Sequence, residues 1–182
     1  MKQLADIKPS IKAYSYSYDN LKREGKIIEN DLRESTKVKK YLSRAKDDYL
    51  YANATKALIE NDKIKSQLGL PSEFQNVYHW LIIQSYYAMY HAATAAVAKK
   101  KIKCDSHIAT ITALAKHYLA ENDIELSFLK TLEYVYITYI ESGRESRRGA
   151  QYNVDSQYTK KEAYEVFENA GKFIKKISDM IG

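Results

Sequence analysis

Apolar positions repeat at helical spacing along most of the chain. From about Arg33 to Gln67 they recur at intervals of three and four residues or their sums, and the lysines and aspartates between them fall mostly on the other side. Gly69-Leu70-Pro71 then interrupts the pattern. We therefore predict a first long helix over 33–67. Its buried stripe is formed by Val38, Tyr41, Leu42, Ala45, Tyr49, Ala52 and Ile59.

A second helical segment runs from Val77 to Val97 and contains no Gly, Pro or charged residue. The sequence Ser72-Glu73-Phe74-Gln75 before it matches an S-x-x-Q capping box. Lys99-Lys100-Lys101 follows, with cations at the C-terminal end that the helix dipole favours. A helix that is apolar on most sides is buried, so we predict that this is the middle helix of a bundle.

The two sides of this central segment differ in side-chain size. Trp80, Tyr87 and His91 are spaced seven and four residues apart and so share one helical face. Small side chains fall close to another face and let a neighbouring helix approach closely, which makes this face a candidate for packing a second subunit. These small residues are Ala88, Ala92, Ala95 and Ala96.

Three further helices are predicted in the C-terminal half. Asp105 or Ser106 caps a helix that reaches about Leu119, and another begins after Glu121-Asn122-Asp123 and ends at Gly143 or near Arg148. A loop over 149–157 precedes the capping box Thr159-Lys160-Lys161-Glu162 of the last helix. The expected inward residues are Ile108, Ile111, Ala115, Tyr118 and Leu119; Phe128, Leu129, Leu132, Val135, Tyr136, Tyr139 and Ile140; and Ala163, Val166, Phe167, Ala170, Ile174, Ile177 and Ile181.

These segments predict an all-α protein, an antiparallel up-and-down bundle of four to five helices over residues 31–182, without a strand. Residues 1–30 are treated as an N-terminal extension. There, Tyr14, Tyr16 and Tyr18 alternate with small or polar residues, a pattern too short to decide between a strand and a short helix opened by Pro9-Ser10.

Composition narrows the class of protein. A length of 182 residues suits one domain, and a net charge of +6 gives a mild preference for anionic partners. Cys104 is the only cysteine, so no internal disulfide forms, and a reducing cytosol is expected. The N-terminus lacks an apolar signal-peptide core, and the Val77–Val97 segment contains histidines and tyrosines that suit a core helix better than a membrane span. We therefore expect a cytoplasmic protein without a membrane segment.

Four short segments, taken in order, resemble the HEPN family of small helical domains (higher eukaryotes and prokaryotes nucleotide-binding). The last is similar to the R-x-x-A-D-Y segment of an archaeal and bacterial subfamily, and together they cover roughly residues 35–182. They are Tyr41-Leu42-Ser43-Arg44-Ala45-Lys46-Asp47-Asp48, Ser85-Tyr86-Tyr87-Ala88-Met89-Tyr90-His91-Ala92-Ala93, Ser106-His107-Ile108-Ala109 and Arg147-Arg148-Gly149-Ala150-Gln151-Tyr152.

The resemblance implies a helical bundle that is usually a homodimer. It also implies a partner. In many relatives a minimal nucleotidyltransferase is encoded alongside, and the pair acts as toxin and antitoxin. Active members are metal-independent endoribonucleases with an R-x(4–6)-H motif, in which Arg holds the phosphate and His transfers a proton to or from the ribose 2′-hydroxyl. Both subunits line the cleft, and no cofactor is expected.

Arg144, Arg147 and Arg148 are the first candidates for a binding site. Spacings of three and four residues place them on one helical face if the helix persists, and each guanidinium offers a planar fork of donors suited to phosphate. The alternative is a solvated helix end, where the dipole favours cations and Glu141 and Glu145 neutralise them.

The chain departs from the nuclease motif at its histidine. With Arg147 as the first motif residue, four intervening residues lead to Tyr152, and the register that starts at Arg144 supplies no histidine either. A tyrosine with an ordinary pKa near 10 is a poor general base at neutral pH, so ribonuclease activity resting on Arg147 and Tyr152 is in doubt. In some relatives a tyrosine just beyond the histidine is modified with AMP, a role that the resemblance opens for Tyr152. Packing against the bundle is the alternative.

The remaining chemical groups form no familiar site. The histidines lack the H-x-x-x-H and E-x-x-H spacings of zinc and di-iron proteins, so no metal is predicted. His91 is interpreted as a hydrogen-bonded core histidine. His107 opens a helix, where anions bind, and is a candidate phosphate contact beside the three arginines; the alternatives are local capping or contact with the fourth helix. Cys104 has no identifiable partner base and is interpreted as unreactive.

Two functional hypotheses follow. The first is a HEPN-type dimer, toxin-like, that binds RNA or nucleotide at a cleft lined by Arg144, Arg147, Arg148 and Tyr152 and is paired with a nucleotidyltransferase. The second is a non-catalytic dimeric helical module that binds a protein partner. A metal-dependent bundle enzyme is disfavoured because its carboxylate and histidine spacings are absent.

Overall fold

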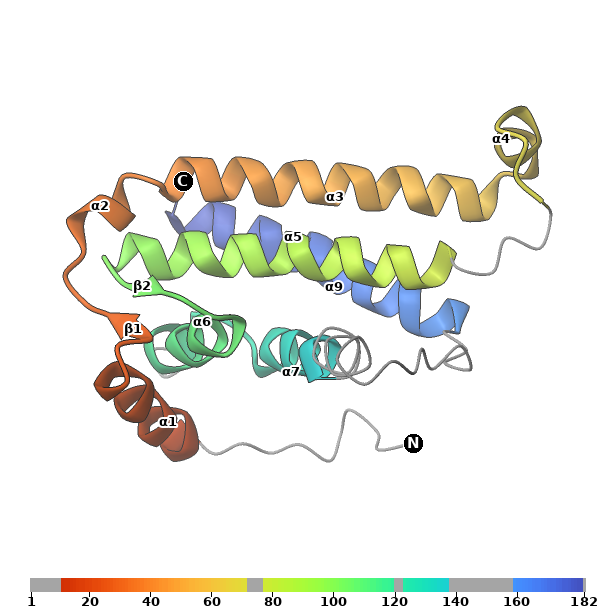
Figure 1. Ribbon diagram of the computed structural model, residues 1–182. Helices are drawn as coiled ribbons and strands as arrows, with labels where there is room; N and C mark the ends of the chain where they lie inside the picture. The colour runs from red at the N-terminus through yellow and green to blue at the C-terminus, as the bar shows by residue number, and fades with distance from the viewer. Residues whose placement is uncertain (1–10, 72–76, 120–122, 138–158, 182) are drawn as a thin grey trace.

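Three long helices lie side by side and form the body of the molecule (Figure 1). The computed structural model describes residues 11–71, 77–119, 123–137 and 159–181, with side chains from Ser17 onward except that of Val77. The long helices are α3 (Val38–Glu60), α5 (Val77–Lys99) and α9 (Lys160–Ile181), and α5 packs extensively against both of the others. Hydrogen bonds join Thr55 to Gln84 and Asp48 to His91, so α3 and α5 run antiparallel. The predicted all-α bundle is confirmed.

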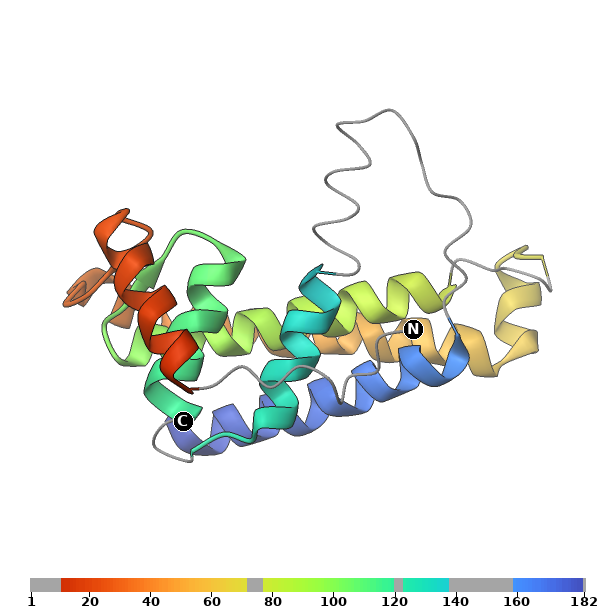
Figure 2. The same ribbon diagram turned by 90° about the horizontal axis from the view of Figure 1, so that it is seen from below.

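Shorter elements cover one side and one end of these three helices. Figure 2 shows α7 (Leu126–Val135) crossing the long helices, with α6 (His107–Leu114) near one end and α1 (Ile11–Arg23) outside α6. The third helix reaches Leu119 as expected, with its last turn widened into a π-helix, η2 (Ala115–Leu119). The other elements are α2 (Leu32–Ser35), α4 (Asp62–Gln67), and two short strands, β1 (Ile27–Ile28) and β2 (Lys103–Cys104).

The two strands correct the expectation of a protein without strands. They pair antiparallel, with Ile27 opposite Cys104 and Ile28 opposite Lys103. Two residues in each strand carry too little alternation to be seen in a sequence pattern. The pairing fixes the segment between α1 and α2 to the segment between α5 and α6.

The predicted single helix over 33–67 is divided into three by local capping. The Asp31 side chain accepts hydrogen bonds from the backbone of Arg33 and Glu34 and begins α2. Asn61 has an extended backbone that ends α3, and its side chain accepts from Lys63 and Ile64 to begin α4. Asn is a favoured N-cap, so one polar side chain is enough to set this boundary. The apolar period continues across it in the sequence and does not reveal it.

Two other helix starts agree with the sequence. Ser106, one of the two candidates, caps α6 by accepting a hydrogen bond from the backbone of Ala109 at 3.2 Å. At α9, Thr159 Oγ1 accepts from the Glu162 backbone and Glu162 Oε2 accepts from the Thr159 backbone, the reciprocal pair of a capping box. The capping box proposed at 72–75 lies outside the described residues.

The tyrosine alternation near the N-terminus belongs to helix α1. Tyr18 is fully buried, and its hydroxyl donates a hydrogen bond to Glu29 at 2.9 Å. The ring of His117 on η2 meets the Tyr18 ring edge-on, so α1 is attached to the bundle by contacts far apart in sequence. The division into an extension over 1–30 and a domain over 31–182 stays a prediction.

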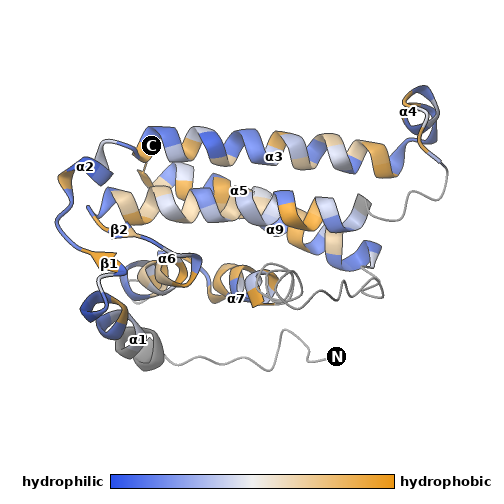
Figure 3. Cartoon of the chain, in the orientation of Figure 1, coloured by the Kyte–Doolittle hydropathy of each residue, from blue (hydrophilic) through white to orange (hydrophobic). Residues whose placement is uncertain are grey.

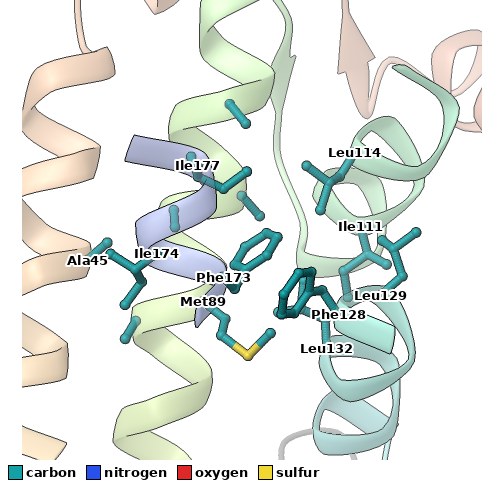
Figure 4. Close-up of a cluster of buried hydrophobic side chains, with 14 of the residues drawn as sticks. Ala45, Met89, Ile111, Leu114, Phe128, Leu129, Leu132, Phe173, Ile174 and Ile177 are labelled. Carbon is teal, nitrogen blue, oxygen red and sulfur yellow. The ribbon is translucent and has the colours of Figure 1, made fainter. Parts of the chain in front are cut away.

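The core lies where the long helices meet α6 and α7. Figure 4 shows Phe128 and Leu132 of α7 near Phe173 of α9 and Met89 of α5, with Leu129 next to Ile111 of α6. In Figure 3, hydrophilic residues are frequent along α3, while α6 and α7 are mostly hydrophobic. All the residues of α9 that the helical spacing assigned to the core are buried.

The structure corrects three expectations about burial, two on the central helix α5 and one on α6. The four alanines of α5 (Ala88, Ala92, Ala95 and Ala96) are fully buried within the chain itself, where α5 packs against α3 and α9. They are therefore not a free surface for a second subunit. Trp80, assigned to the face of Tyr87 and His91, is 53% exposed, and Ile108, assigned to the core, is 38% exposed. Both lie near helix ends, where fewer neighbours cover a side chain.

Replacing Gly171 by alanine is expected to destabilise the protein, although alanine favours helices. A Cβ atom here would lie 2.9 Å from Tyr49 Cζ and closer still to the hydroxyl oxygen. The Tyr49 ring cannot easily move because it stacks on Phe167 with centroids 4.9 Å apart. Overpacking costs about 1–3 kcal/mol, which exceeds the roughly 1 kcal/mol gained in helix propensity.

The comparison is made by urea unfolding of wild type, Gly171→Ala, and Gly171→Ala combined with Tyr49→Leu. The double variant removes the clashing hydroxyl and ring, so the alanine should cost less there than in the wild-type background. An alanine that stabilises the otherwise unchanged protein would show that α3 and α9 do not approach this closely.

Candidate functional site

Four of the five residues proposed for the site, Arg144, Arg147, Arg148 and Tyr152, lie outside the described residues. The fifth, His107, is described and belongs to a cluster of ring side chains. We define the aromatic–histidine cluster as Tyr86, Tyr87, Tyr90, His91, His107 and Tyr136.

His107 is the first residue of α6 and lies over the α5 tyrosines. Its ring stacks on Tyr90 with centroids 4.1 Å apart and planes 3° from parallel. Its Nδ1 lies 2.6 Å from the hydroxyl of Tyr86. The Tyr136 ring lies 5.5 Å away, just beyond α7. The expected contact with the fourth helix is therefore present, whereas the capping role belongs to Ser106.

The tyrosines of the cluster come from one helix because of their spacing. Tyr86 and Tyr90 are four residues apart, and Tyr87 and His91 repeat that spacing one position later. Two neighbouring rows of rings result: Tyr86 is fully buried, and Tyr87, Tyr90 and His91 are partly buried. The partly buried rings give the cluster a side that is accessible to solvent.

His91 is joined to α3 by a hydrogen bond. Its Nδ1 lies 2.6 Å from Asp48 Oδ2, and the two side chains are 18% and 21% exposed. The interpretation of His91 as a hydrogen-bonded histidine is confirmed, but its ring also reaches the cluster, 5.5 Å from Tyr90 and 6.2 Å from Tyr87. Asp48 was not among the sequence candidates, although it ends the first segment of the family resemblance.

Burial shifts the pKa of three members of the cluster. It lowers the pKa of His107, with a smaller lowering from nearby His91. It raises the pKa of Tyr86 far above its ordinary value, and also that of Tyr90. At neutral pH the Tyr86 hydroxyl is therefore protonated and the His107 ring is neutral. The Tyr86 hydroxyl and His107 Nδ1 share a hydrogen bond in which the donor is set by the tautomer of the ring.

The lowered pKa of His107 predicts that the protein loses stability as the pH falls. The unfolded chain takes up the histidine proton near pH 6.5, before the folded protein does, so stability is full above that pH and decreases below it. Burial lowers the pKa of His79 in the same direction. Unfolding in urea at intervals from pH 7.5 to 5 should show a decreasing free energy, with a smaller decrease in His107→Leu.

Between pH 7.5 and 5 the expected change in stability comes from the histidines and not from the carboxylates. Hydrogen bonds lower the pKa of Glu29 and Glu60, so their contributions are lost only below the ordinary carboxylate range. A His107→Leu slope equal to that of wild type would mean that His107 is as easily protonated in the folded protein as in the unfolded chain.

Other chemistry is limited in the described part of the chain. Burial raises the pKa of Cys104 to about 12, which supports its interpretation as an unreactive thiol. Over the described ranges, no group of three or more histidine, cysteine or acidic side chains is arranged to hold a metal ion. Among the helices that are described, none combines the length and the apolar character needed to cross a bilayer.

A model of the HEPN domain matches residues 72–180, more than half of the chain. The chain belongs to the HEPN family. Within this HEPN domain the match begins just before α5 and ends within α9, so it includes the whole aromatic–histidine cluster. Asp48, on α3, lies outside the matched range. No curated protein and no solved structure is significantly similar to the chain.

Proposed function

We propose that this HEPN protein binds RNA or nucleotide as the toxin-like member of a pair with a nucleotidyltransferase. The observation that supports the proposal best is the aromatic–histidine cluster, whose partly buried rings follow one side of α5. Unpaired bases bind by stacking on aromatic and histidine rings, and each stacked base contributes about 1–3 kcal/mol.

The arginines complement the cluster chemically. Tyr136 contacts His107, and Arg144 follows Tyr136 by eight residues in the chain. Guanidinium groups bind phosphate through paired hydrogen bonds, and rings bind bases, so the two groups together suit a single-stranded nucleic acid. In this proposal Arg144, Arg147 and Arg148 hold phosphates, with His107 beside them, and Tyr152 lines the same cleft of a homodimer.

The proposal predicts that the purified protein binds a fluorescent single-stranded RNA and that the arginines provide much of the affinity. Replacing Arg144, Arg147 and Arg148 by alanine should weaken binding at least about tenfold. It should also reduce the slope of log affinity against log salt by roughly 2, since each lost phosphate contact removes about 0.7. Fluorescence anisotropy at several salt concentrations measures both quantities.

The matched control removes three cations from α9 by replacing Lys161, Lys175 and Lys176, which are all exposed. It has the same net charge as the arginine variant, so equal losses in both variants would indicate non-specific attraction. A wild-type protein that binds neither RNA nor nucleotide would favour the alternative, a dimeric helical module that binds a protein.

The proposed pairing has its own test. If a nucleotidyltransferase gene neighbours this one, the two proteins should copurify, and mass spectrometry should find an AMP group on Tyr152. Tyr152→Phe should remove that modification without preventing copurification. An unmodified Tyr152 in the copurified pair would contradict the role proposed for this residue.

A further inference from the structure

We propose that one end of the helical bundle docks on an anionic membrane surface. This basic end consists of residues 26–40 and 99–105, which lie together where α5 ends and α3 begins (Figure 1). The pairing of β1 with β2 joins the two segments, and the Asp31 backbone donates a hydrogen bond to the Lys101 carbonyl at 2.9 Å. The basic end shares no residue with the proposed RNA site, so the two proposals are independent.

The basic end holds nearly all of the net charge of the protein. It contains nine lysines and arginines and four acidic residues, whereas the whole chain has a net charge of +6. Three of the four acidic residues are already engaged in ion pairs or in helix capping: Glu29, Asp31 and Glu34. Five cations are exposed and form no ion pair within the described part of the chain, so their charge is available to an external anion. They are Arg33, Lys39, Lys40, Lys101 and Lys103.

Three of these lysines stand where the local structure disfavours them. The first turn of α3 contains Lys39 and Lys40 and no acidic residue, although the helix dipole disfavours positive charge at an N-terminus. Lys101 follows the end of α5 with a φ of 61°, the left-handed conformation that glycine adopts at least cost after a helix. Both placements lower the stability of the fold. Such exceptions are expected where a sequence serves function instead of folding.

Two aliphatic side chains are exposed among these cations. Ile28 is 46% exposed and lies opposite Lys103 in the strand pairing, and Leu32, the first residue of α2, is 65% exposed. An aliphatic side chain in this setting is stabilised by entering the boundary between headgroups and acyl chains of a bilayer. The long lysine side chains around it reach the anionic headgroups at the same time.

The same composition favours a membrane over a nucleic acid as the partner. Eight of the nine cations are lysines, which act as point charges, whereas the planar fork of arginine is favoured for nucleic-acid recognition. The two segments contain no aromatic residue on which an unpaired base could stack. Exposed aliphatic side chains add nothing to phosphate binding but add apolar area for insertion into a bilayer. Clusters of about 4–8 basic residues are typical of proteins that bind anionic lipid.

The first test is sedimentation of the full-length protein with vesicles of phosphatidylcholine that contain or lack phosphatidylserine. Binding should require phosphatidylserine and weaken as salt is added, because salt screens the attraction between exposed charges. Replacing Lys39, Lys40 and Lys103 by glutamine should weaken binding about 100-fold, since each cation near an anionic surface contributes about fivefold.

The matched control replaces three exposed lysines at the opposite end of the bundle, Lys63, Lys160 and Lys161, by glutamine. The Tyr164 hydroxyl donates a hydrogen bond to Glu60, so the start of α9 lies beside the end of α3, far from the basic end. The control has the same net charge as the first variant and should bind vesicles within about twofold of wild type. Equal losses in the two variants would indicate non-specific attraction and would overturn the docking of this end.

A second variant tests the aliphatic side chains without changing the charge. Ile28→Thr combined with Leu32→Gln should weaken vesicle binding at least about tenfold, because the apolar area that enters the bilayer is lost. Circular dichroism should show an unchanged fold, since both side chains are exposed. An affinity equal to that of wild type would overturn insertion of these side chains.

Lys101→Gly separates binding from stability. The substitution should raise the melting temperature, because glycine relieves the left-handed backbone, while it weakens vesicle binding about fivefold. A lysine retained for stability would instead lower the melting temperature when it is replaced.

RNA is the competing partner and is tested on the same variants. Wild type that binds no vesicles containing phosphatidylserine would overturn the membrane proposal. If, in addition, the variant of Lys39, Lys40 and Lys103 lost RNA binding, the basic end would be assigned to RNA. Neither result bears on the arginines and rings of the proposed function, which are tested by their own variants.

Discussion

Replacing Phe173 by alanine is expected to lower the free energy of unfolding by about 3–5 kcal/mol. Phe173 is fully buried on α9, and its ring centroid lies 5.2 Å from that of Phe128 on α7. Figure 4 shows the two rings together at the centre of the core, where α7 and α9 meet α5. Removing the ring leaves a cavity that three separate helices would have to move to fill.

Urea unfolding monitored by circular dichroism measures this loss. Tyr51→Ala provides the control, because it removes an aromatic ring from a residue of α3 that is 64% exposed and should change the stability by less than about 0.5 kcal/mol. Phe173→Leu keeps much of the volume and should fall between the two. A Phe173→Ala variant within 1 kcal/mol of wild type would contradict the packing of α7 on α9.

The helical period was sufficient to predict most of the core. Ala163, Ile174 and Ile177 were assigned to the inside of the last helix, and all are buried there. The same period was insensitive to helix boundaries: it continues past Asn61, where one side chain ends α3 and begins α4. A periodic pattern records which side of a helix is apolar, whereas a cap depends on the hydrogen bonds of one residue.

The candidate site was only partly predictable, because it depends on contacts between distant segments. His107 was singled out by its position at a helix start, and it does lie in the cluster. Asp48 is separated from His91 by 43 residues, so nothing in the local sequence indicates that the two side chains meet. The alanines of α5 predicted a close helix contact correctly, but sequence could not show that α3 and α9 of the same chain supply it.

Replacing Tyr86 by alanine is expected to be about as destabilising as the loss of Phe173, at roughly 3–5 kcal/mol. Tyr86 is fully buried, and its ring lies parallel to that of His107 with centroids 5.7 Å apart. Its hydroxyl also provides the hydrogen bond to His107 Nδ1. Truncation therefore removes core volume and a polar partner together, and this position links the stability of the fold to the shape of the candidate site.

Tyr86→Phe separates these two contributions. It keeps the ring and leaves Nδ1 of His107 without its hydrogen-bond partner, which costs about 1–3 kcal/mol for a half-buried polar group. In a double-mutant cycle with His107→Leu, the second substitution should cost less once the first is made, with a coupling energy of about 0.5–3 kcal/mol. Additive losses would mean that the two side chains do not interact. Coupled losses, with weaker RNA binding by both single variants, would mean that the buried hydroxyl holds the ring on which the base stacks.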